Sequence, residues 1–473
     1  MSTYIPHTDE DRREMLSFLG LSSVKELFLD IPVEILEKEP MGIPTGISEH
    51  EALGKMKKYA DKNKTDLISF MGCGSYDHII PAAIDGLISR GEFLTAYTPY
   101  QAEISQGILQ AIFEFQSMIC ELNGMDVSNA SLYDGHTAIA EAAVIGLNSG
   151  AKKDTILYSS TLHPHTIQVL QTFFADLPVF IEEIPEVDGE TDLGGLESQL
   201  GPNVACVILQ TPNVYGILED YTGVAEKLNE YKSLFIVSSN PVSLGLMKPP
   251  GEWGAHIGVG DLQPFGLSPC YGGPSVGYMA ASKKYMRKLP GRISGQTLDK
   301  GGLRSYVLTL QAREQHIKRE RATSNICSNQ ALAAIACTIH MSLIGKEGLK
   351  EVASQCTAKA HYLQDKITKD LSISLLHNKP FFHEFTLELP CEASKLVKDM
   401  TDNECFLAGV DLGGLKEKAG CSPSGTPGVQ NMNLLTIAVT EKRSRLEMDE
   451  YVSALGRSLK RMTTFSNGVG GDK

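Results

Sequence analysis

The segment Asp134-Gly135-His136-Thr137 precedes an apolar run with helical spacing that ends at Gly150. A helix that begins here has free backbone N–H groups in its first turn, beside a glycine and a hydroxyl group, and such helix starts bind anions. The segment is therefore a candidate phosphate cradle. An ordinary capped helix explains the same residues, and the spacing matches neither a P-loop nor a dinucleotide-binding fingerprint.

Two histidines, His163 and His165, follow the apolar run TILYSS at residues 155–160. This places an imidazole at the carboxyl edge of a predicted sheet, where α/β proteins bind ligands. Two histidines at positions i and i+2 also suggest a metal, but the sequence offers no evident third ligand. We therefore expect a loop-positioned imidazole and no metal site.

Two loops concentrate hydrogen-bonding side chains around glycine or proline. Residues 70–77 are rich in glycine and end in Tyr76 and Asp77. The other loop contains Tyr97, Thr98, Tyr100, Gln101 and Glu103. Polar side chains of this density cost folding free energy when they are buried without partners, so they face water, a ligand or another subunit. The two loops indicate a site or an interface, and a purely structural role is an equal alternative.

Residues 313–321, REQHIKRER, are mostly charged and include Arg319 and Arg321. Their spacing predicts a long helix over residues 307–322 whose solvated face carries ion pairs between positions i and i+4. The segment Thr323-Ser324-Asn325 then ends this helix or caps the next one. Residues 328–370 predict two more helices.

The elements that must position these residues alternate along the chain. Apolar, β-branched runs at 155–160, 178–184, 204–210 and 234–239 alternate with helical stretches at 166–174 and 223–231. This pattern predicts a doubly wound, mostly parallel α/β sheet. Strands at 372–376, 384–389 and 434–439 with helices at 392–401 and 445–462 predict a smaller α+β domain. The expected division is a helical arm (1–60), a large domain (61–325), a small domain (326–465) and a disordered tail (466–473).

Composition excludes several classes of protein. The 473 residues include 42% hydrophobic and 21% charged residues, with a net charge of -14. So acidic a chain is a poor general binder of nucleic acid, which requires a basic surface. None of the ten cysteines forms a C-x-x-C pair, the N-terminus is polar, and no apolar run approaches the ~20 residues of a membrane span. We expect a cytoplasmic protein without membrane or nucleic-acid partners.

Eight stretches give the chain a resemblance to a known family. They are YIPHTDEDRREML (4–16), FMGCGSYDHIIPA (70–82), TAYTPYQAEISQG (95–107), ASLYDGHTAIAEAA (130–143), LMKPPGEWGAHI (246–257), KLPGRISGQT (288–297), LTLQAREQHIKRERATSNICSNQAL (308–332) and AVTEKRS (438–444). In this order they resemble the glycine decarboxylase P-protein of the glycine cleavage system. The chain is most similar to the α, or N-terminal-type, subunit of the form divided between two subunits.

The resemblance implies a fold and a reaction. The fold would be that of the aspartate-aminotransferase-like, or fold type I, pyridoxal-phosphate enzymes. The assembled P-protein condenses glycine with pyridoxal phosphate, releases CO2 and passes the aminomethyl group to the lipoyl arm of the H-protein. The family also implies an α2β2 assembly with a second subunit. Glycine is the substrate that the resemblance implies.

Alignment with the cofactor-bearing type of subunit removes two essential groups from this chain. The shared GGP segment at 272–274 places the Schiff-base lysine of that subunit at Gln263, and an amide cannot form an imine. The acid that pairs with the pyridinium nitrogen aligns near Ser238. The nearest lysines are Lys248 and Lys283. We therefore expect no covalently bound cofactor on this chain and pyridoxal phosphate on the partner subunit.

The resemblance turns the polar loops into candidates for completing a partner's active site. The first choices are Tyr97, Thr98, Tyr100, Gln101 and Glu103, and the second are Tyr76, Asn325, Arg319 and Arg321. Asp134 to Thr137 would be a vestigial phosphate cradle. Two alternatives remain open: a self-sufficient decarboxylase with its imine on Lys248 or Lys283, and a purely structural scaffold subunit.

Overall fold

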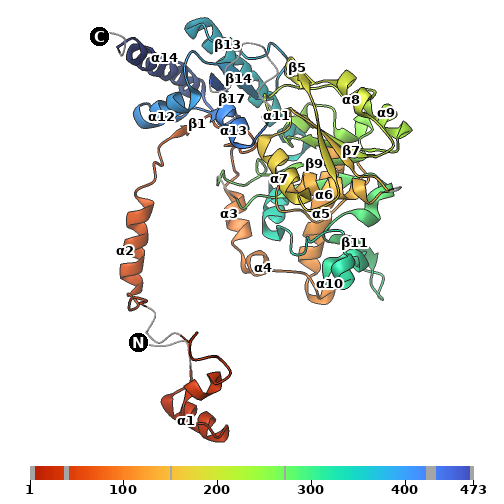
Figure 1. Cartoon of the computed structure of the whole chain (residues 1–473), viewed down its shortest axis with the longest axis vertical. Coiled ribbons are helices and arrows are strands. Elements are labelled where there is room, and N and C mark those ends of the chain that lie inside the picture. Colours follow the sequence, from red (N-terminus) through yellow and green to blue (C-terminus); the bar gives the residue numbers. More distant parts are fainter. Residues whose placement is uncertain (1–5, 37–41, 150–151, 271–272, 422–432, 469–473) are drawn as a thin grey trace. The chain divides into compact units, whose positions relative to one another are not determined.

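The computed structural model of the chain describes residues 6–36, 42–149, 152–270, 273–421 and 433–468 (Figure 1). It contains two compact units, Met1–Thr65 and Asp66–Lys473. The first unit contains the helices α1 (Asp9–Phe18) and α2 (Glu49–Ala60) and the 3-10 helix η1 (Val24–Phe28). Both α-helices begin with capping boxes. None of this unit's described residues is buried, and Phe18 is 91% exposed.

The second unit is built on a seven-stranded sheet of order β2-β10-β9-β8-β7-β3-β4. Five neighbouring strands are parallel: β9 (Ile257–Asp261), β8 (Leu234–Ser239), β7 (Val204–Thr211), β3 (Thr155–Ser159) and β4 (Phe180–Ile184). The strand β10 (Gly277–Ala281) runs antiparallel to both β9 and β2 (Val127–Ser128). The predicted doubly wound, mostly parallel α/β fold is confirmed.

Helices cover both faces of this sheet, because successive side chains of each strand point to opposite faces. On one face, Ile156 and Ile236 pack with α6 (Gly135–Leu147) and α7 (Pro164–Phe174). On the other face, Leu157 and Val237 pack with α8 (Leu193–Gln199) and α9 (Val224–Glu230). The near-continuous apolar strands seen in the sequence follow from this double coverage.

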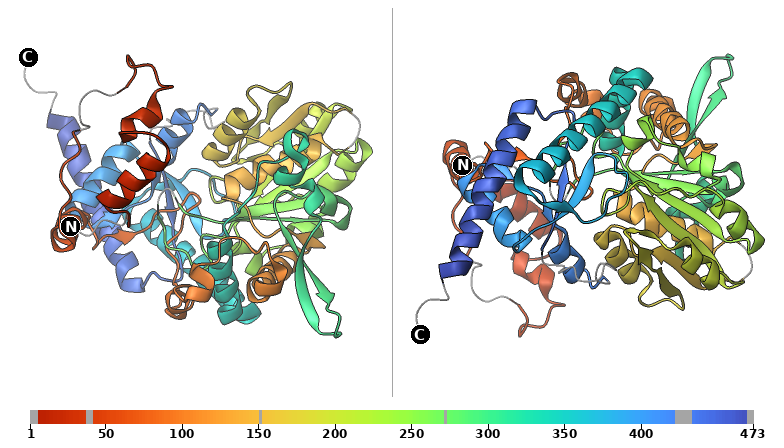
Figure 2. Two further views of the ribbon diagram at one scale, coloured as in Figure 1. Left: turned by 90° about the horizontal axis from the view of Figure 1, so that it is seen from below. Right: turned by 90° about the horizontal axis from the view of Figure 1, so that it is seen from above.

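The predicted helix over residues 307–322 is wrong. The strands β11 (Ile293–Leu298) and β12 (Arg304–Thr309) form an antiparallel hairpin instead, which extends from the body of the second unit (Figure 2). Three short turns follow: η6 (Gln311–Arg313), α10 (Gln315–Lys318) and η7 (Arg319–Arg321). Leu310 and Arg319 have φ angles of 54°, in the left-handed region, which a continuous helix cannot contain.

The helix α11 (Ala331–Leu371) contains two helical segments, as predicted, separated at Gly345 (φ 58°, ψ -172°). Within the described part of the chain it is the helix long and apolar enough, by length and composition only, to cross a membrane. Its buried residues, among them Cys337 and Leu363, belong to two hydrophobic clusters of the second unit. It is therefore a core helix of this unit.

A four-stranded antiparallel sheet of order β13-β14-β17-β16 occupies the C-terminal part of the chain. Its strands are β13 (Ser374–Leu375), β14 (Glu384–Glu388), β16 (Val410–Asp411) and β17 (Leu434–Ala438), and its helices are α12 (Ala393–Asn403), α13 (Leu412–Lys418) and α14 (Arg445–Gly468). The division at residues 325 and 326 stays a prediction. Of the predicted tail, α14 includes residues up to Gly468 and the remainder lies outside the described residues.

Phe70 joins the N-terminal edge of the second unit to this C-terminal part. It follows β1 (Ile68–Ser69), which pairs in parallel with β15 (Phe406–Leu407). Its ring is fully buried. The centroid of this ring lies 4.3 Å from that of Tyr451 and 6.0 Å from that of Phe406. Three aromatic rings from distant segments thus form one contact.

We expect Phe70→Ala to lower the free energy of unfolding by about 3–5 kcal/mol, because it leaves a cavity among these rings. Urea unfolding followed by circular dichroism measures the change. The control is Phe18→Ala, whose exposed ring should change stability by less than about 0.5 kcal/mol. An unchanged urea midpoint for Phe70→Ala would contradict this assignment of the contact.

Candidate functional site

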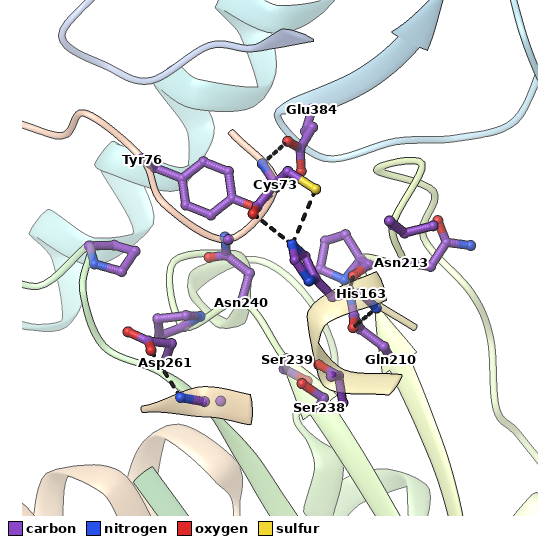
Figure 3. A pocket seen from close by; sticks show the side chains of 18 of the residues that line it. Cys73, Tyr76, His163, Gln210, Asn213, Ser238, Ser239, Asn240, Asp261 and Glu384 are labelled. Carbon is purple, nitrogen blue, oxygen red and sulfur yellow. Dashed lines mark hydrogen bonds between the residues drawn. The ribbon is translucent and has the colours of Figure 1, made fainter. Parts of the chain in front are cut away.

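A cavity of about 100 Å³ lies at the carboxyl ends of β3, β7, β8 and β9 (Figure 3). The 70–77 loop and the start of β14 close it from the other side, through Cys73, Tyr76 and Glu384. This is the edge at which parallel α/β sheets bind their ligands. Among the described residues that line it, Asp261 and Glu384 are the carboxylic acids, and there is no lysine or arginine.

The start of α6 faces this cavity and is occupied by two carboxylates of the chain itself. Asp134 caps the helix, with Oδ1 accepting from the Thr137 amide at 2.8 Å. The Gly135 amide donates to Asp261 Oδ2 at 2.9 Å, and Asp261 also accepts from the Gln263 amide and the Ser275 hydroxyl. The helix dipole favours negative charge at this position. Burial nevertheless raises the pKa of Asp261 to about 6.

Gln263, the position aligned with a Schiff-base lysine, is a buried structural side chain. Its Oε1 accepts from the Tyr76 amide at 2.8 Å, and its Nε2 donates to the carbonyl groups of Tyr76 and Leu267 at 3.0 and 2.7 Å. The two bonds to Tyr76 hold the 70–77 loop against the segment after β9, and the bond to Leu267 lies within that segment. Lys248 and Lys283 are exposed and do not line the cavity.

The strand β8 ends at the cavity in Ser238 and Ser239, both of which line it. Ser238 is the position aligned with the pyridinium-pairing acid. Within the described residues, the buried Ser239 Oγ has no hydrogen-bond partner. A serine hydroxyl carries no charge, so this strand end gives no ionic partner to a protonated ring nitrogen.

The opposite wall combines a thiol, an imidazole and an acid. His163 Nε2 lies 2.8 Å from the Cys73 carbonyl oxygen and 3.2 Å from Cys73 Sγ. Glu384 accepts from the Cys73 amide, and its Oε2 accepts from the Tyr76 hydroxyl at 3.0 Å. Burial raises the pKa of Glu384 to about 7 and that of the Cys73 thiol, and it lowers the pKa of His163. At neutral pH the thiol and the imidazole of this wall are therefore uncharged, whereas Glu384 is partly ionised.

The polar loop at 97–103 lies outside the cavity lining. Tyr97 and Tyr100 are 73% and 60% exposed, and Gln101 and Glu103 are also exposed. The loop is anchored from beneath by the buried Arg292, which donates to Thr98 Oγ1 at 3.2 Å and lies 5.2 Å from the centre of the Tyr100 ring. Exposed polar side chains on a fixed base suit an interface better than an internal pocket.

The remaining candidates divide into two groups. Tyr76, Gly135, His136 and Ser238 line the cavity, whereas Arg319, Arg321 and Asn325 are exposed and do not. The vestigial-cradle interpretation of Asp134 to Thr137 stays a prediction. Two carboxylates of the chain itself occupy that helix start.

Sequence reasoning missed four residues that shape the site: Asp261, Cys73, Glu384 and Arg292. Asp261 had a local signal, because it is an acid at the end of a buried strand two residues before Gln263. The other three had none, since Cys73 meets Glu384 across 311 positions and Arg292 meets Thr98 across 194.

Comparisons with known proteins show what the chain is similar to. The sequence profile of the family described as "Glycine cleavage system P-protein" matches residues 2–415. The "Probable glycine dehydrogenase (decarboxylating) subunit 1" of Prosthecochloris aestuarii is 48% identical, over 96% of this chain and 99% of the relative. The protein of the same description from Geobacillus kaustophilus is 45% identical, over 96% of this chain and 98% of the relative.

Solved structures support the same family and the same fold. The inhibitor-bound crystal structure of glycine decarboxylase (P-protein) of the glycine cleavage system is 37% identical with a TM-score of 0.84, covering 97% of this chain and all of that one. An alanine–glyoxylate aminotransferase from Nostoc sp. is 14% identical with a TM-score of 0.56, covering 90% of this chain and 98% of that one, and shows the fold alone. This chain therefore belongs to the glycine cleavage system P-protein family.

Proposed function

We propose that this chain is subunit 1 of a two-subunit glycine decarboxylase and that it holds no cofactor covalently. The family depends on pyridoxal phosphate, and the relatives that match nearly the whole chain are named as subunit 1 of glycine dehydrogenase (decarboxylating). In this proposal pyridoxal phosphate, which serves as the electron sink for the decarboxylation, is bound by subunit 2.

The observation that carries the proposal is the Asp261 carboxylate on the Gly135 amide. A pyridoxal-phosphate site needs a lysine for the imine, donors for a phosphate dianion and an acid for the ring nitrogen. Here a carboxylate takes the helix start where a phosphate would bind, and an anion beside it would be repelled. With Gln263 and Ser238 at the other two positions, the residues present do not fit the cofactor.

The self-sufficient alternative requires Lys248 or Lys283 to carry the imine. Both side chains are exposed, and neither lines the cavity at the carboxyl edge of the sheet. The Lys248 ammonium group lies 5.9 Å from the Trp253 ring. Neither lysine has the buried, desolvated surroundings that lower an amine's pKa for imine formation.

The contribution of this chain to catalysis is then made at the contact with subunit 2. The loop with Tyr97, Thr98, Tyr100, Gln101 and Glu103 presents donors and acceptors on a base fixed by Arg292. Beneath it, Arg292 Nε lies 3.9 Å from Glu314 Oε2, and neither group has a hydrogen bond through these atoms within the described residues. In the proposal the loop completes the glycine site of the partner.

The assembled enzyme would be an α2β2 heterotetramer in the cytoplasm. It would release CO2 from glycine and transfer the aminomethyl group to the lipoyl arm of the H-protein. Arg319, Arg321 and Asn325 are additional exposed candidates for the same interface. The unburied apolar residues of the first unit, such as Phe18 and Leu29, give this unit surface that a partner can cover.

We expect the purified chain to retain no pyridoxal phosphate after the excess is removed, because it lacks both the imine-forming lysine and a phosphate site. Absorption spectroscopy, followed by borohydride reduction and peptide mapping, measures retention. Subunit 2 treated in the same way is the positive control, and mixing the subunits should restore glycine-dependent CO2 exchange. An imine band with a modified Lys248 or Lys283 would support the self-sufficient alternative instead.

We expect Tyr97→Phe and Glu103→Gln each to lower the CO2 exchange rate of the assembled complex about tenfold or more. Tenfold is the kinetic equivalent of one lost hydrogen bond of about 1.4 kcal/mol in the transition state. Tyr231→Phe, at another partly exposed tyrosine, is the matched control and should leave the rate unchanged. Unchanged rates for both loop variants, with normal subunit association, would favour the scaffold alternative.

We expect limited trypsin digestion to cut within residues 6–65 of the isolated chain faster than within the second unit. The reason is that none of the described residues there is buried. Addition of subunit 2 should slow these cuts at least several-fold, as followed by mass spectrometry. Equal cleavage with and without subunit 2 would show that the first unit is not part of the interface.

A further inference from the structure

Three histidines meet at the start of α7, beside the cavity. His163 and His165 belong to the first turn of that helix, and His136 lies in the first turn of α6. The ring centroid of His163 is 4.9 Å from that of His136 and 5.1 Å from that of His165. One ring nitrogen of each lies within 4.8 Å of those of the other two. The sequence had suggested only two of these three.

The hydrogen bonds of His136 and His163 indicate which ring nitrogen of each could bind an ion. His136 Nδ1 lies 2.8 Å from the Thr166 hydroxyl oxygen, which leaves Nε2 without a partner among the described residues. His163 Nε2 faces the Cys73 carbonyl oxygen at 2.8 Å, which requires a proton there and places the lone pair on Nδ1. That lone pair accepts one bond, from the His165 amide at 3.1 Å.

Such an arrangement has the form of a metal site with its outer hydrogen bonds in place. Metal-binding histidines usually donate their second ring N–H to a carbonyl or hydroxyl oxygen, which fixes the tautomer and the ring orientation. His163 has such a bond in the protein alone, and His136 has one in the tautomer that carries its proton on Nδ1. A metal on His163 Nδ1 replaces a single amide contact, a small loss beside the binding of three imidazoles.

Charge at this position favours a cation over an anion. The described lining of the cavity contains two carboxylic acids and no lysine or arginine. A cation approaching the three rings therefore meets no fixed positive side chain in that lining.

We propose that His136, His163 and His165 form a binding site for one zinc ion. Three neutral imidazoles with a fourth position for water make a tetrahedral set that zinc accepts, and imidazole suits it better than magnesium or calcium. The exposed His165 gives the ion a path from solvent. The zinc site does not depend on the function proposed for the chain in glycine cleavage.

A second group of possible ligands argues for this choice by contrast. His78, Cys356 and Glu441 are all buried, but they already bond to one another. His78 Nδ1 lies 2.7 Å from Glu441 Oε2, and Cys356 Sγ donates to the same oxygen at 3.3 Å. None of the three is exposed, so an ion has no path to them from solvent, in contrast to the group that contains the exposed His165.

The test titrates the full chain, without an affinity tag and treated with EDTA, with zinc chloride in a calorimeter. We expect one equivalent to bind, and His165→Ala and His136→Ala each to raise the dissociation constant at least tenfold. His165 is exposed, so its variant should fold as the parent does. His50→Ala, at an exposed histidine of α2, is the matched control and should bind zinc unchanged.

Cobalt chloride provides the independent readout. Tetrahedral Co2+ on nitrogen ligands absorbs visible light, and we expect this band in the parent chain and in His50→Ala but not in His165→Ala. Binding of less than one equivalent, or binding that is equal in His165→Ala and the parent, would overturn the proposal. Loss of the band in His50→Ala would do the same, because it would indicate surface histidines.

Discussion

The bond from the Gly135 amide to the Asp261 carboxylate determines the chemistry of the whole cavity. It joins the end of β9 to the start of α6, and the same carboxylate accepts from Gln263 and Ser275 in the segment between β9 and β10. A helix start attracts an anion, and here that anion is a side chain of the same protein. A Cβ on Gly135 would lie 3.0 Å from the Asp261 Cβ, so glycine is what allows this approach. An external phosphate would have to displace a half-buried carboxylate from its three donors.

With that position filled, the remaining groups act as a joint between the two sheets of the second unit. Glu384 begins β14 of the small sheet and holds the Cys73 amide and the Tyr76 hydroxyl. His163 begins α7 of the large sheet and holds the Cys73 carbonyl group. The 70–77 loop is thus bound on both sides, and Gln263 fixes it from below. Around Cys73 and Tyr76 these polar groups satisfy one another, which lowers the cost of burying them.

The sequence was sufficient for four of the five parallel strands, missed β9, and was insufficient for the cavity. Residues 155–160, 204–210 and 234–239 were predicted within one residue of the observed strands, because burial on both faces leaves an uninterrupted apolar run. The helix predicted over residues 307–322 was wrong. The spacing of its charges fits a helix, but β12 is held in a hairpin by pairing with β11. Family resemblance located Gln263 and Ser238. It did not locate Glu384, whose partners lie more than 300 positions away in the sequence.

The proposed division of labour between two subunits is supported by where this chain places its charge. A buried arginine normally has its donors filled within its own chain, because unpaired buried polar groups are costly. Arg292 is 1% exposed as a side chain, yet its Nε is unpaired in the described part of the chain and both Glu314 carboxylate oxygens lack donors. What Arg292 does bond are Thr98 and Tyr100, which belong to the exposed loop. Neither this buried charged group nor the solvent-facing tyrosines above it line the internal cavity. A second protein that covered the loop would remove water from Tyr97 and Tyr100, above a pair that is already buried.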